Sequence, residues 1–187
     1  MLVLLVLARI WIMYRFGIQN YDPQWLNGRD SINGVHGERL ARLAGRNLRH
    51  VWAVWDVRSD EWFSDAPVLL DFGDQLVSID HQKFDDVCIT WNILDPARAI
   101  EDDSEDSLFD LVWRPDATPQ LAELAGRTLE RVVLLEWAGG ADDMANGSIA
   151  IGLDLAPSWL TIYNALDENG FAYGDPDDCY RQHPLAV

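Results

Sequence analysis

Hydrophobic positions along the chain alternate between short helical stretches and short runs that are typical of strands. Leu40 and Leu43 have the spacing of one helix face, and the same spacing recurs at Leu121 and Leu124. Apolar runs rich in β-branched and aromatic residues predict strands at 51–55, 67–72, 76–79, 87–91, 108–113, 132–135, 148–153 and 159–162. Turn residues separate these runs. Short strands joined by tight turns predict antiparallel meanders with a helix on one face.

The sequence contains an internal repeat. Residues 40–51 and 121–132 are identical at eight of twelve positions, at a constant offset of 81. In each copy a glycine, Gly45 or Gly126, stands where the C-terminal cap of a helix needs a left-handed residue. The apolar runs that follow also match in position. We therefore expect an α+β fold of two tandem pseudo-symmetric units, each a short helix packed on an antiparallel β-meander.

The expected organisation follows from the repeat and from one acidic run. Six residues, 101–106, carry five acids, and like charges this dense indicate a solvated loop. Fused copies usually pack about a pseudo-twofold axis, which often leaves a cleft between the halves. The expected segments are an N-terminal segment (1–35), repeat unit 1 (36–100), an acidic linker (101–107), repeat unit 2 (108–174) and a turn-like tail (175–187).

The first 18 residues are largely apolar, but they do not predict a membrane-spanning helix. Arg9 and Arg15 interrupt the stretch, and a spanning helix needs about 20 mostly uncharged residues. A basic start and a cleavage site, the marks of a signal peptide, are also missing. Three interpretations remain: a buried strand or helix at 2–14, a short membrane-surface segment, or an upstream start codon with Met13 as the true beginning.

The charge of the chain is strongly negative and uneven. The formal net charge is −17, with a balance of +4 over the first 50 residues and −21 over the rest. Such a body repels nucleic acid and anionic membranes and attracts cations or basic proteins. Acidity also serves solubility, and thirteen Arg against a single Lys are consistent with a coding bias. Cys88 and Cys179 are too few for a disulfide scaffold, so a cytoplasmic location is expected.

One polar cluster has the residue types of an acid–base site. His81 is a candidate general base near neutral pH, and a neighbouring carboxylate from Asp80, Asp85 or Asp86 would orient it. The second copy has Asn164 at the position matching His81, so only one half carries a titratable ring there.

Residues 80–86 also have a purely structural interpretation. A strand end followed by a polar turn would place Phe84 and Leu166, which align in the repeat, as equivalent core residues.

Metal and nucleophile signatures are weak. The pairs Asp85–Asp86 and Asp167–Glu168 and the acids of 175–178 supply oxygen ligands for a divalent cation, but none has the spacing of an EF-hand loop. The four histidines share no metal-ligand spacing, and neither a nucleophile elbow nor a phosphate-binding glycine loop occurs. We therefore predict no metal site and no cofactor.

Two further groups are candidates for binding. Arg46 and Arg127 recur at matched positions, where each would bind an anion or hold a carboxylate of the opposite half. A patch of aromatic residues borders an acidic run, and it would either bind a basic partner or fold back over a hairpin; its members are Trp55, Trp62 and Phe63. Asp167 and Glu168 would add acidic contacts.

Three functions remain open. The first is a non-catalytic module that binds a basic protein, in the manner of an immunity or inhibitor protein. The second is a small enzyme with a site between the halves, using His81 and nearby carboxylates for metal-assisted hydrolysis. The third is a structural or assembly role. Charge, size and the lack of a catalytic motif favour the first.

Overall fold

In the computed structural model, which describes residues 16–101 and 108–186, the chain forms two antiparallel sheets. The first has the order β1-β6-β5-β4-β2-β3, and β7 also pairs with β2. Its strands are β1 (Leu26–Asn27), β2 (His50–Asp56), β3 (Glu61–Trp62), β4 (Val68–Asp71), β5 (Leu76–Gln82), β6 (Asp86–Trp91) and β7 (Leu111–Pro115).

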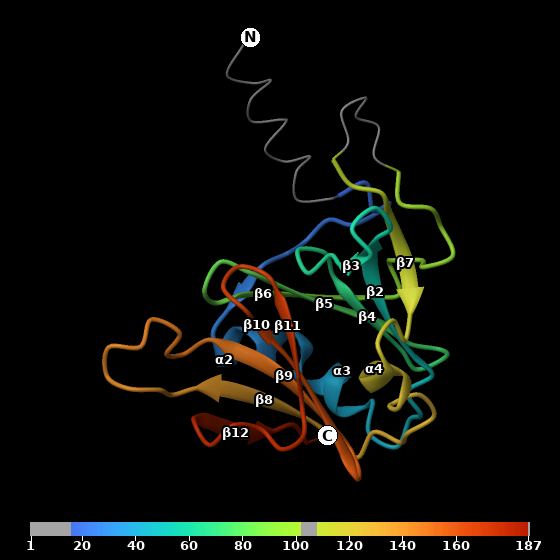
Figure 1. The fold of residues 1–187 in the computed structure, drawn as a ribbon. Coiled ribbons are helices and arrows are strands. Elements are labelled where there is room, and N and C mark those ends of the chain that lie inside the picture. Colours follow the sequence, from blue (N-terminus) through green and yellow to red (C-terminus); the bar gives the residue numbers. More distant parts are fainter. Residues whose placement is uncertain (1–15, 102–107, 187) are drawn as a thin grey trace.

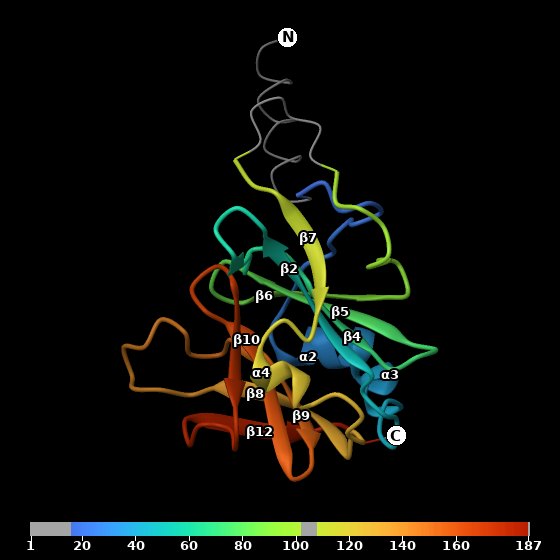
Figure 2. The same cartoon turned by 45° about the vertical axis from the view of Figure 1, so that its right-hand side comes forward.

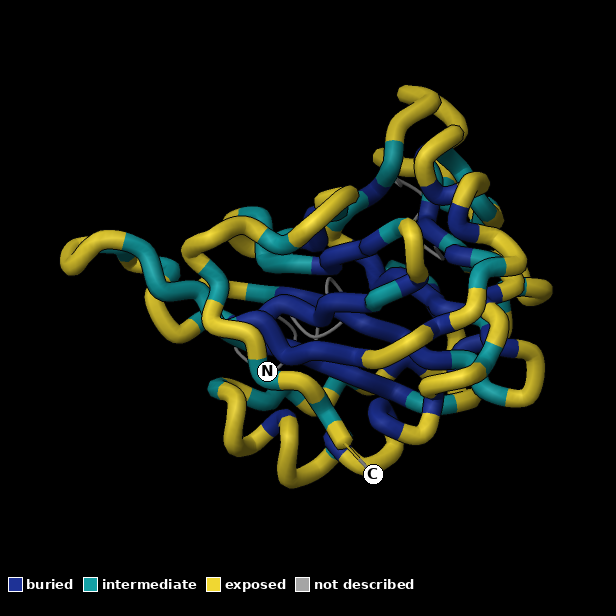
Figure 3. Tube along the Cα trace, turned by 90° about the horizontal axis from the view of Figure 1, so that it is seen from below, coloured by how far each residue is buried: buried dark blue, intermediate teal, exposed yellow. Residues whose placement is uncertain are grey.

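The second sheet has the order β11-β10-β9-β8-β12. Its strands are β8 (Arg131–Trp137), β9 (Ile149–Leu155), β10 (Ser158–Asn164), β11 (Asn169–Tyr173) and β12 (Tyr180–Pro184). The chain is thus mostly β, and it is α+β only in a loose sense. The loop between β8 and β9, orange in Figure 1, projects away from the body and is largely exposed in Figure 3.

Short helices lie between the two sheets (Figures 1 and 2). The first runs without a break through α2 (Arg29–Ile32), a π-helical turn (Asn33–Gly37) and α3 (Glu38–Ala41). The second is α4 (Pro119–Ala122). Its start follows the usual rules, because the hydroxyl of Thr118 accepts a hydrogen bond from the backbone N–H of Leu121 at 3.2 Å and proline occupies the first helical position.

The helices contact the sheet of the other unit. α3 contacts β8, and α4 contacts β2. The sequence predicts that each helix lies on the strands of its own unit, so this crossing differs from the expectation. The crossing is possible because the segment after each helix runs beside its counterpart, with Asn47 and Thr128 forming an isolated antiparallel bridge.

Hydrogen bonds at this crossing come in pairs related by the offset of 81. The N–H of Gly45 donates to the carbonyl of Leu129 at 2.7 Å, and the N–H of Gly126 donates to the carbonyl of Leu48 at 2.7 Å. Both glycines have a left-handed backbone, with φ of 81° and 82°, as the capping argument predicted. The repeated sequence therefore has the same local conformation and reciprocal partners at both places.

One hydrophobic core is shared by both sheets. It includes buried leucines and valines from α3, α4 and the facing strands of each sheet, such as Leu40, Val51, Leu121 and Val132. The far side of the first sheet packs a smaller cluster around Tyr21 and the coil at 16–25, and the far side of the second packs another. Burial on both faces explains why β9 is apolar along most of its length, whereas β5 is equally buried but also carries polar side chains, among them Asp80 and His81.

Two segments lie differently from the expected organisation. β7, which was expected to open unit 2, pairs with β2 in the first sheet. Part of the tail 175–187, expected to be turn-like, forms β12 and pairs with β8. β7 and β12 occupy equivalent positions in the two sheets, because β7 pairs with β2 and β12 pairs with β8, and β2 and β8 are the matched strands of the repeat.

The interpretations of residues 2–14 and of the run 102–106 fall outside the described residues. Within the described part, no helix is both long and apolar enough to cross a membrane.

Candidate functional site

His81 lies on β5, in the interface between the sheets, with 2% of its surface exposed. Its Nδ1 is 3.0 Å from the side-chain oxygen of Asn169, and its Nε2 is 3.2 Å from the carbonyl oxygen of Ile149. Both partners are acceptors, so a neutral ring with one N–H satisfies only one of them. Burial still lowers the pKa of His81 to about 4. A ring that is closed off from solvent and has so low a pKa is a weak and inaccessible base, so it does not fit the general-base role that the sequence suggested.

Asp80 is buried beside His81, and its carboxyl group faces two donors. The hydroxyl of Tyr21 donates to Oδ2, and the side-chain amide of Asn169 donates to Oδ1 at 2.8 Å. Burial raises the pKa of Asp80 to about 7, and these two hydrogen bonds oppose the rise. Asp80 therefore holds a proton up to near-neutral pH, and it bonds to Asn169 rather than orienting the imidazole.

One amide side chain connects these groups across the two sheets. Asn169 begins β11 and is 1% exposed. Its Nδ2 donates to the carbonyl oxygens of Ser64 and Ala66 at 3.1 and 3.0 Å, and its Oδ1 accepts from the backbone N–H of His81 at 3.0 Å. The side-chain amide of Asn169 thus forms hydrogen bonds to backbone N–H and C=O groups, as a peptide group of a neighbouring strand would. We call the following residues the buried polar network: Tyr21, Asp80, His81 and Asn169.

The turns that follow β5 and β10 lie against each other. The backbone N–H of Lys83 donates to the carboxylate of Asp167, and the side-chain amide of Asn164 donates to the carbonyl oxygen of Lys83 at 2.6 Å. The side-chain oxygen of Asn164 accepts from the backbone N–H of Asp167 at 2.9 Å. One turn comes from each sheet. We call residues 82–86 and 164–168 the joined turns.

Each of the joined turns exposes one large apolar side chain. Phe84 is 51% exposed and Leu166 is 76% exposed. The interpretation of these two as equivalent core residues is therefore wrong, because both stand at turns beyond the strand ends. The backbone here is unusual: φ is 52° at Lys83, 66° at Leu166 and 83° at Asp167, a region that residues other than glycine rarely adopt.

The joined turns carry four carboxylates next to the two apolar side chains in sequence; they belong to Asp85, Asp86, Asp167 and Glu168. A fifth carboxylate, that of Asp65, lies close to those of Asp167 and Glu168. Burial raises the pKa of Asp65, and the charges of Glu168 and Asp167 raise it further. Nearby, the ammonium group of Lys83 lies 2.8 Å from the carboxylate of Asp86. The joined turns therefore combine exposed apolar surface with an excess of negative charge. The sequence analysis proposed that Asp85 or Asp86 would orient the ring of His81. Both lie instead in the joined turns, together with Asp167 and Glu168.

Arg46 and Arg127 owe their recurrence to the helix ends. The Nε of Arg46 donates to the carbonyl of Arg42 at 3.4 Å, and the Nε of Arg127 donates to the carbonyl of Glu123 at 2.9 Å, four residues back in both cases. Arginine at a helix C-terminus satisfies free carbonyl groups and opposes the helix dipole. Arg46 also pairs with Asp74, a carboxylate of its own half rather than the opposite one.

The aromatic patch expected from the sequence is packed inward. Phe63 is 9% exposed. Trp62 packs against the main core and stacks on Phe171, with ring centroids 4.4 Å apart. Trp55 pairs with Trp62 across the β2–β3 hairpin, and the guanidinium of Arg114 covers its ring at 4.5 Å. The hairpin alternative thus describes the packing of these rings.

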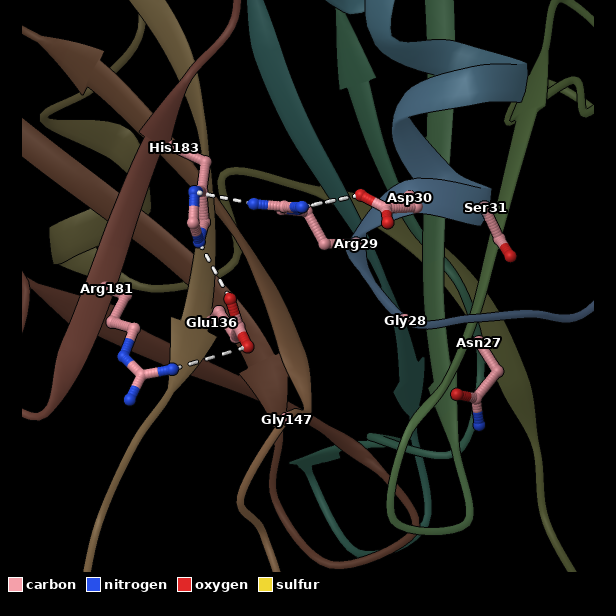
Figure 4. A pocket seen from close by; sticks show the side chains of 9 residues that line it. All are labelled: Asn27, Gly28, Arg29, Asp30, Ser31, Glu136, Gly147, Arg181 and His183. Carbon is pink, nitrogen blue, oxygen red and sulfur yellow. Dashed lines mark hydrogen bonds and ion pairs between the residues drawn. The ribbon is translucent and has the colours of Figure 1, made fainter.

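A cleft of about 500 Å³ opens between the start of the first helix and the second sheet (Figure 4). Residues 27–31 form one wall, and the other wall contains Glu136 of β8 with Arg181 and His183 of β12. The sequence analysis missed these residues. No motif marks them, because they meet only through the pairing of β12 with β8.

Within the described residues, no group of three or more His, Cys, Asp or Glu side chains has an arrangement that would hold a metal ion. Comparison of the chain with protein-family models, with curated proteins and with solved structures found no match.

Proposed function

We propose that the chain is an acidic, non-catalytic module that binds a basic protein through the joined turns. The observation that carries the proposal is that Phe84 and Leu166 are exposed on two turns that hydrogen bonds join to each other and that also carry carboxylates. Apolar anchors within a charged rim are the usual composition of a protein–protein interface.

Backbone conformation supports this location. Left-handed φ at Leu166 costs free energy for a residue with a side chain, and proteins retain such strain mostly at functional sites. Burying Leu166 would avoid exposing an apolar side chain, yet the fold holds it outward. A partner that covers Leu166 and Phe84 would gain the apolar contact area that solvent now occupies.

Charge supports the nature of the partner. The net charge of −17 attracts a basic protein from a distance and speeds its encounter. The joined turns contain four carboxylates and one ammonium group, so the local charge has the same sign. Binding should therefore weaken as salt rises.

The test is capture from host lysate by the tagged protein, washed with rising salt. The wild type is compared with Phe84→Ser/Leu166→Asn, which removes both apolar groups. The control is Val35→Ser, since Val35 is 61% exposed on the π-helical turn, outside the joined turns. A stoichiometric basic protein retained by wild type and control but lost from the double variant supports the proposal. Equal retention by all three, or an empty eluate at low salt, contradicts it.

The enzyme alternative is weaker, because its base, His81, is enclosed. The assembly alternative, in which the apolar N-terminal residues 1–14 would dock on a partner, concerns residues outside the described part of the chain. We further propose that the fold arose by duplication, with two pseudo-symmetric halves, supported by the reciprocal hydrogen bonds of Gly45 and Gly126. A reducing, cytoplasmic location remains our proposal, supported by the free thiols of Cys88 and Cys179.

A further inference from the structure

The cleft between the first helix and the second sheet gathers charged side chains from both halves. Figure 4 shows Arg29 reaching across from the helix toward His183, with Glu136 and Arg181 on the opposite wall. These groups lie apart from the joined turns in sequence and belong to other elements. The cleft is therefore a separate candidate site, and an inference about it does not depend on the proposed protein-binding function.

The contacts of His183 fix its tautomer. The guanidinium of Arg29 donates to Nδ1 at 3.4 Å, and Nε2 lies 2.8 Å from a carboxylate oxygen of Glu136. A guanidinium only donates and a carboxylate only accepts, so the neutral ring carries its proton on Nε2. The imidazole therefore links a cation of the first half to an anion of the second, and Glu136 is occupied by the ring N–H.

The ion pairs of both guanidinium groups are exposed to solvent. The Nε and Nη2 of Arg29 donate to one carboxylate oxygen of its chain neighbour Asp30 at 3.0 and 2.7 Å; the side chain of Asp30 is 88% exposed, and such solvated pairs contribute little. Arg181 lies 3.9 Å from Glu136 and is itself 70% exposed. A guanidinium has five N–H donors, so each arginine keeps donors for a further acceptor. Both bonds from Arg29 to Asp30 go to a single oxygen, so an anion with two oxygens would form a bidentate pair that this contact does not provide.

We propose that this cleft binds a small ligand through a phosphate or carboxylate group, with Arg29 and Arg181 as its cationic partners. The volume of about 500 Å³ is within the range of small-molecule sites. Asn27 and Ser31 also line the cleft and supply neutral hydrogen-bonding groups for the rest of such a ligand. When Arg29 turns to the anion, Nδ1 of His183 is released, so the ring reports occupancy directly.

The test follows the imidazole proton resonances of His183 by NMR during titration with inorganic phosphate and, separately, with acetate. His183→Asn assigns the signal among the four histidines. We expect saturation in the millimolar range with at least one anion, and the anion that saturates identifies the ligand group. Arg29→Gln and Arg181→Gln should each weaken binding about fivefold to tenfold.

The matched control is Arg98→Gln, since Arg98 is 57% exposed and pairs with Asp95 outside the cleft. It should bind like the wild type. The proposal is overturned if neither anion shifts the His183 signal saturably, or if the shifts are the same in the cleft variants as in the control. Circular dichroism of each variant shows whether it is folded before titration.

Discussion

The side-chain oxygen of Asn169, in the second sheet, accepts a hydrogen bond from the backbone N–H of His81, in the first sheet, at 3.0 Å. The same amide donates to the carboxyl group of Asp80, so one buried side chain bonds two consecutive residues of β5. A donor or acceptor that loses its hydrogen-bond partner in such a dry interface costs folding free energy. The buried polar network is therefore expected to hold the sheets in register.

Asn169→Ala should destabilise the fold strongly. It leaves the N–H of His81, the carbonyl of Ala66 and one oxygen of Asp80 without this partner, at about 1–3 kcal/mol for each unsatisfied buried group, while the carbonyl of Ser64 keeps its bond from the backbone N–H of residue 169. We expect the free energy of unfolding, measured in urea, to fall by about 3 kcal/mol or more. Asn146→Ala is the control, because its amide bonds the carbonyl of Gly140 at an exposed site and should change stability by less than about 0.5 kcal/mol. Equal effects would contradict the role of the network.

Stability should depend on pH through Asp80 and His81 with opposite signs. The unfolded chain loses the Asp80 proton near its ordinary pKa of 3.8, whereas the folded chain keeps it to about 7, so this group destabilises the fold as pH rises between the two. The unfolded chain protonates His81 below 6.5, whereas the folded chain resists to about 4, so this group destabilises the fold as pH falls. Between pH 4 and 6.5 the two should largely cancel.

Above pH 6.5 the carboxyl effect of this pair dominates. From pH 6.5 to 8 the free energy of unfolding should fall by about 0.5 kcal/mol, because the folded state still holds part of the Asp80 proton that the unfolded chain has lost, and the last of the His81 effect offsets some of this fall. Asp80→Asn should abolish that fall and leave a rise in stability between pH 4 and 6.5. Urea titrations at a series of pH values measure both. A wild-type curve and an Asp80→Asn curve with the same shape would show that Asp80 titrates normally.

The paired glycines at the crossing should respond alike. Gly45→Ala and Gly126→Ala place a side chain at φ of 81° and 82°, where the added Cβ meets no other atom within 4 Å. The cost is therefore backbone strain alone, about 1 kcal/mol at each site. Gly140→Ala also has open space but needs no left-handed backbone, so its effect should be near zero. A cost at only one of the paired glycines would mean that the two copies are not equivalent.

Leu166→Asn should separate stability from binding. Asparagine tolerates the left-handed φ of 66° better than leucine, and little buried surface is lost because Leu166 is 76% exposed. The thermal midpoint should therefore rise, with a gain of about 1 kcal/mol, while affinity for the basic partner falls. Calorimetry measures the first and the capture assay the second. A loss of stability would mean that Leu166 contributes to packing.

Much of the strand pattern was predictable from the sequence, because turn residues and apolar runs are local signals. The helical positions of Leu40 and Leu121 and the left-handed glycines after them were also local signals, but the start of the first helix at Arg29 was not predicted. The crossing of the helices was not, because it depends on which sheet each leucine face meets. β12 was missed because Tyr180–Pro184 is polar and half-exposed as an edge strand.

The candidate sites were predicted less well, and the reason is burial. His81 and Asp80 read as a polar strand end, yet Asn169 and Tyr21, distant in sequence, enclose them and supply their hydrogen bonds. A single sequence does not show which distant amide pairs with a buried acid. Phe84 looked like core for the opposite reason, since its hydrophobicity does not reveal that its turn ends outside the sheet.

The most direct test of the account is hydrogen–deuterium exchange of the chain bound to the basic protein that it captures. The account predicts slower exchange on binding at residues 82–86 and 164–168, with the helix at 29–41 unchanged. Protection confined to other parts of the surface, with the joined turns exchanging as they do in the free chain, would contradict it.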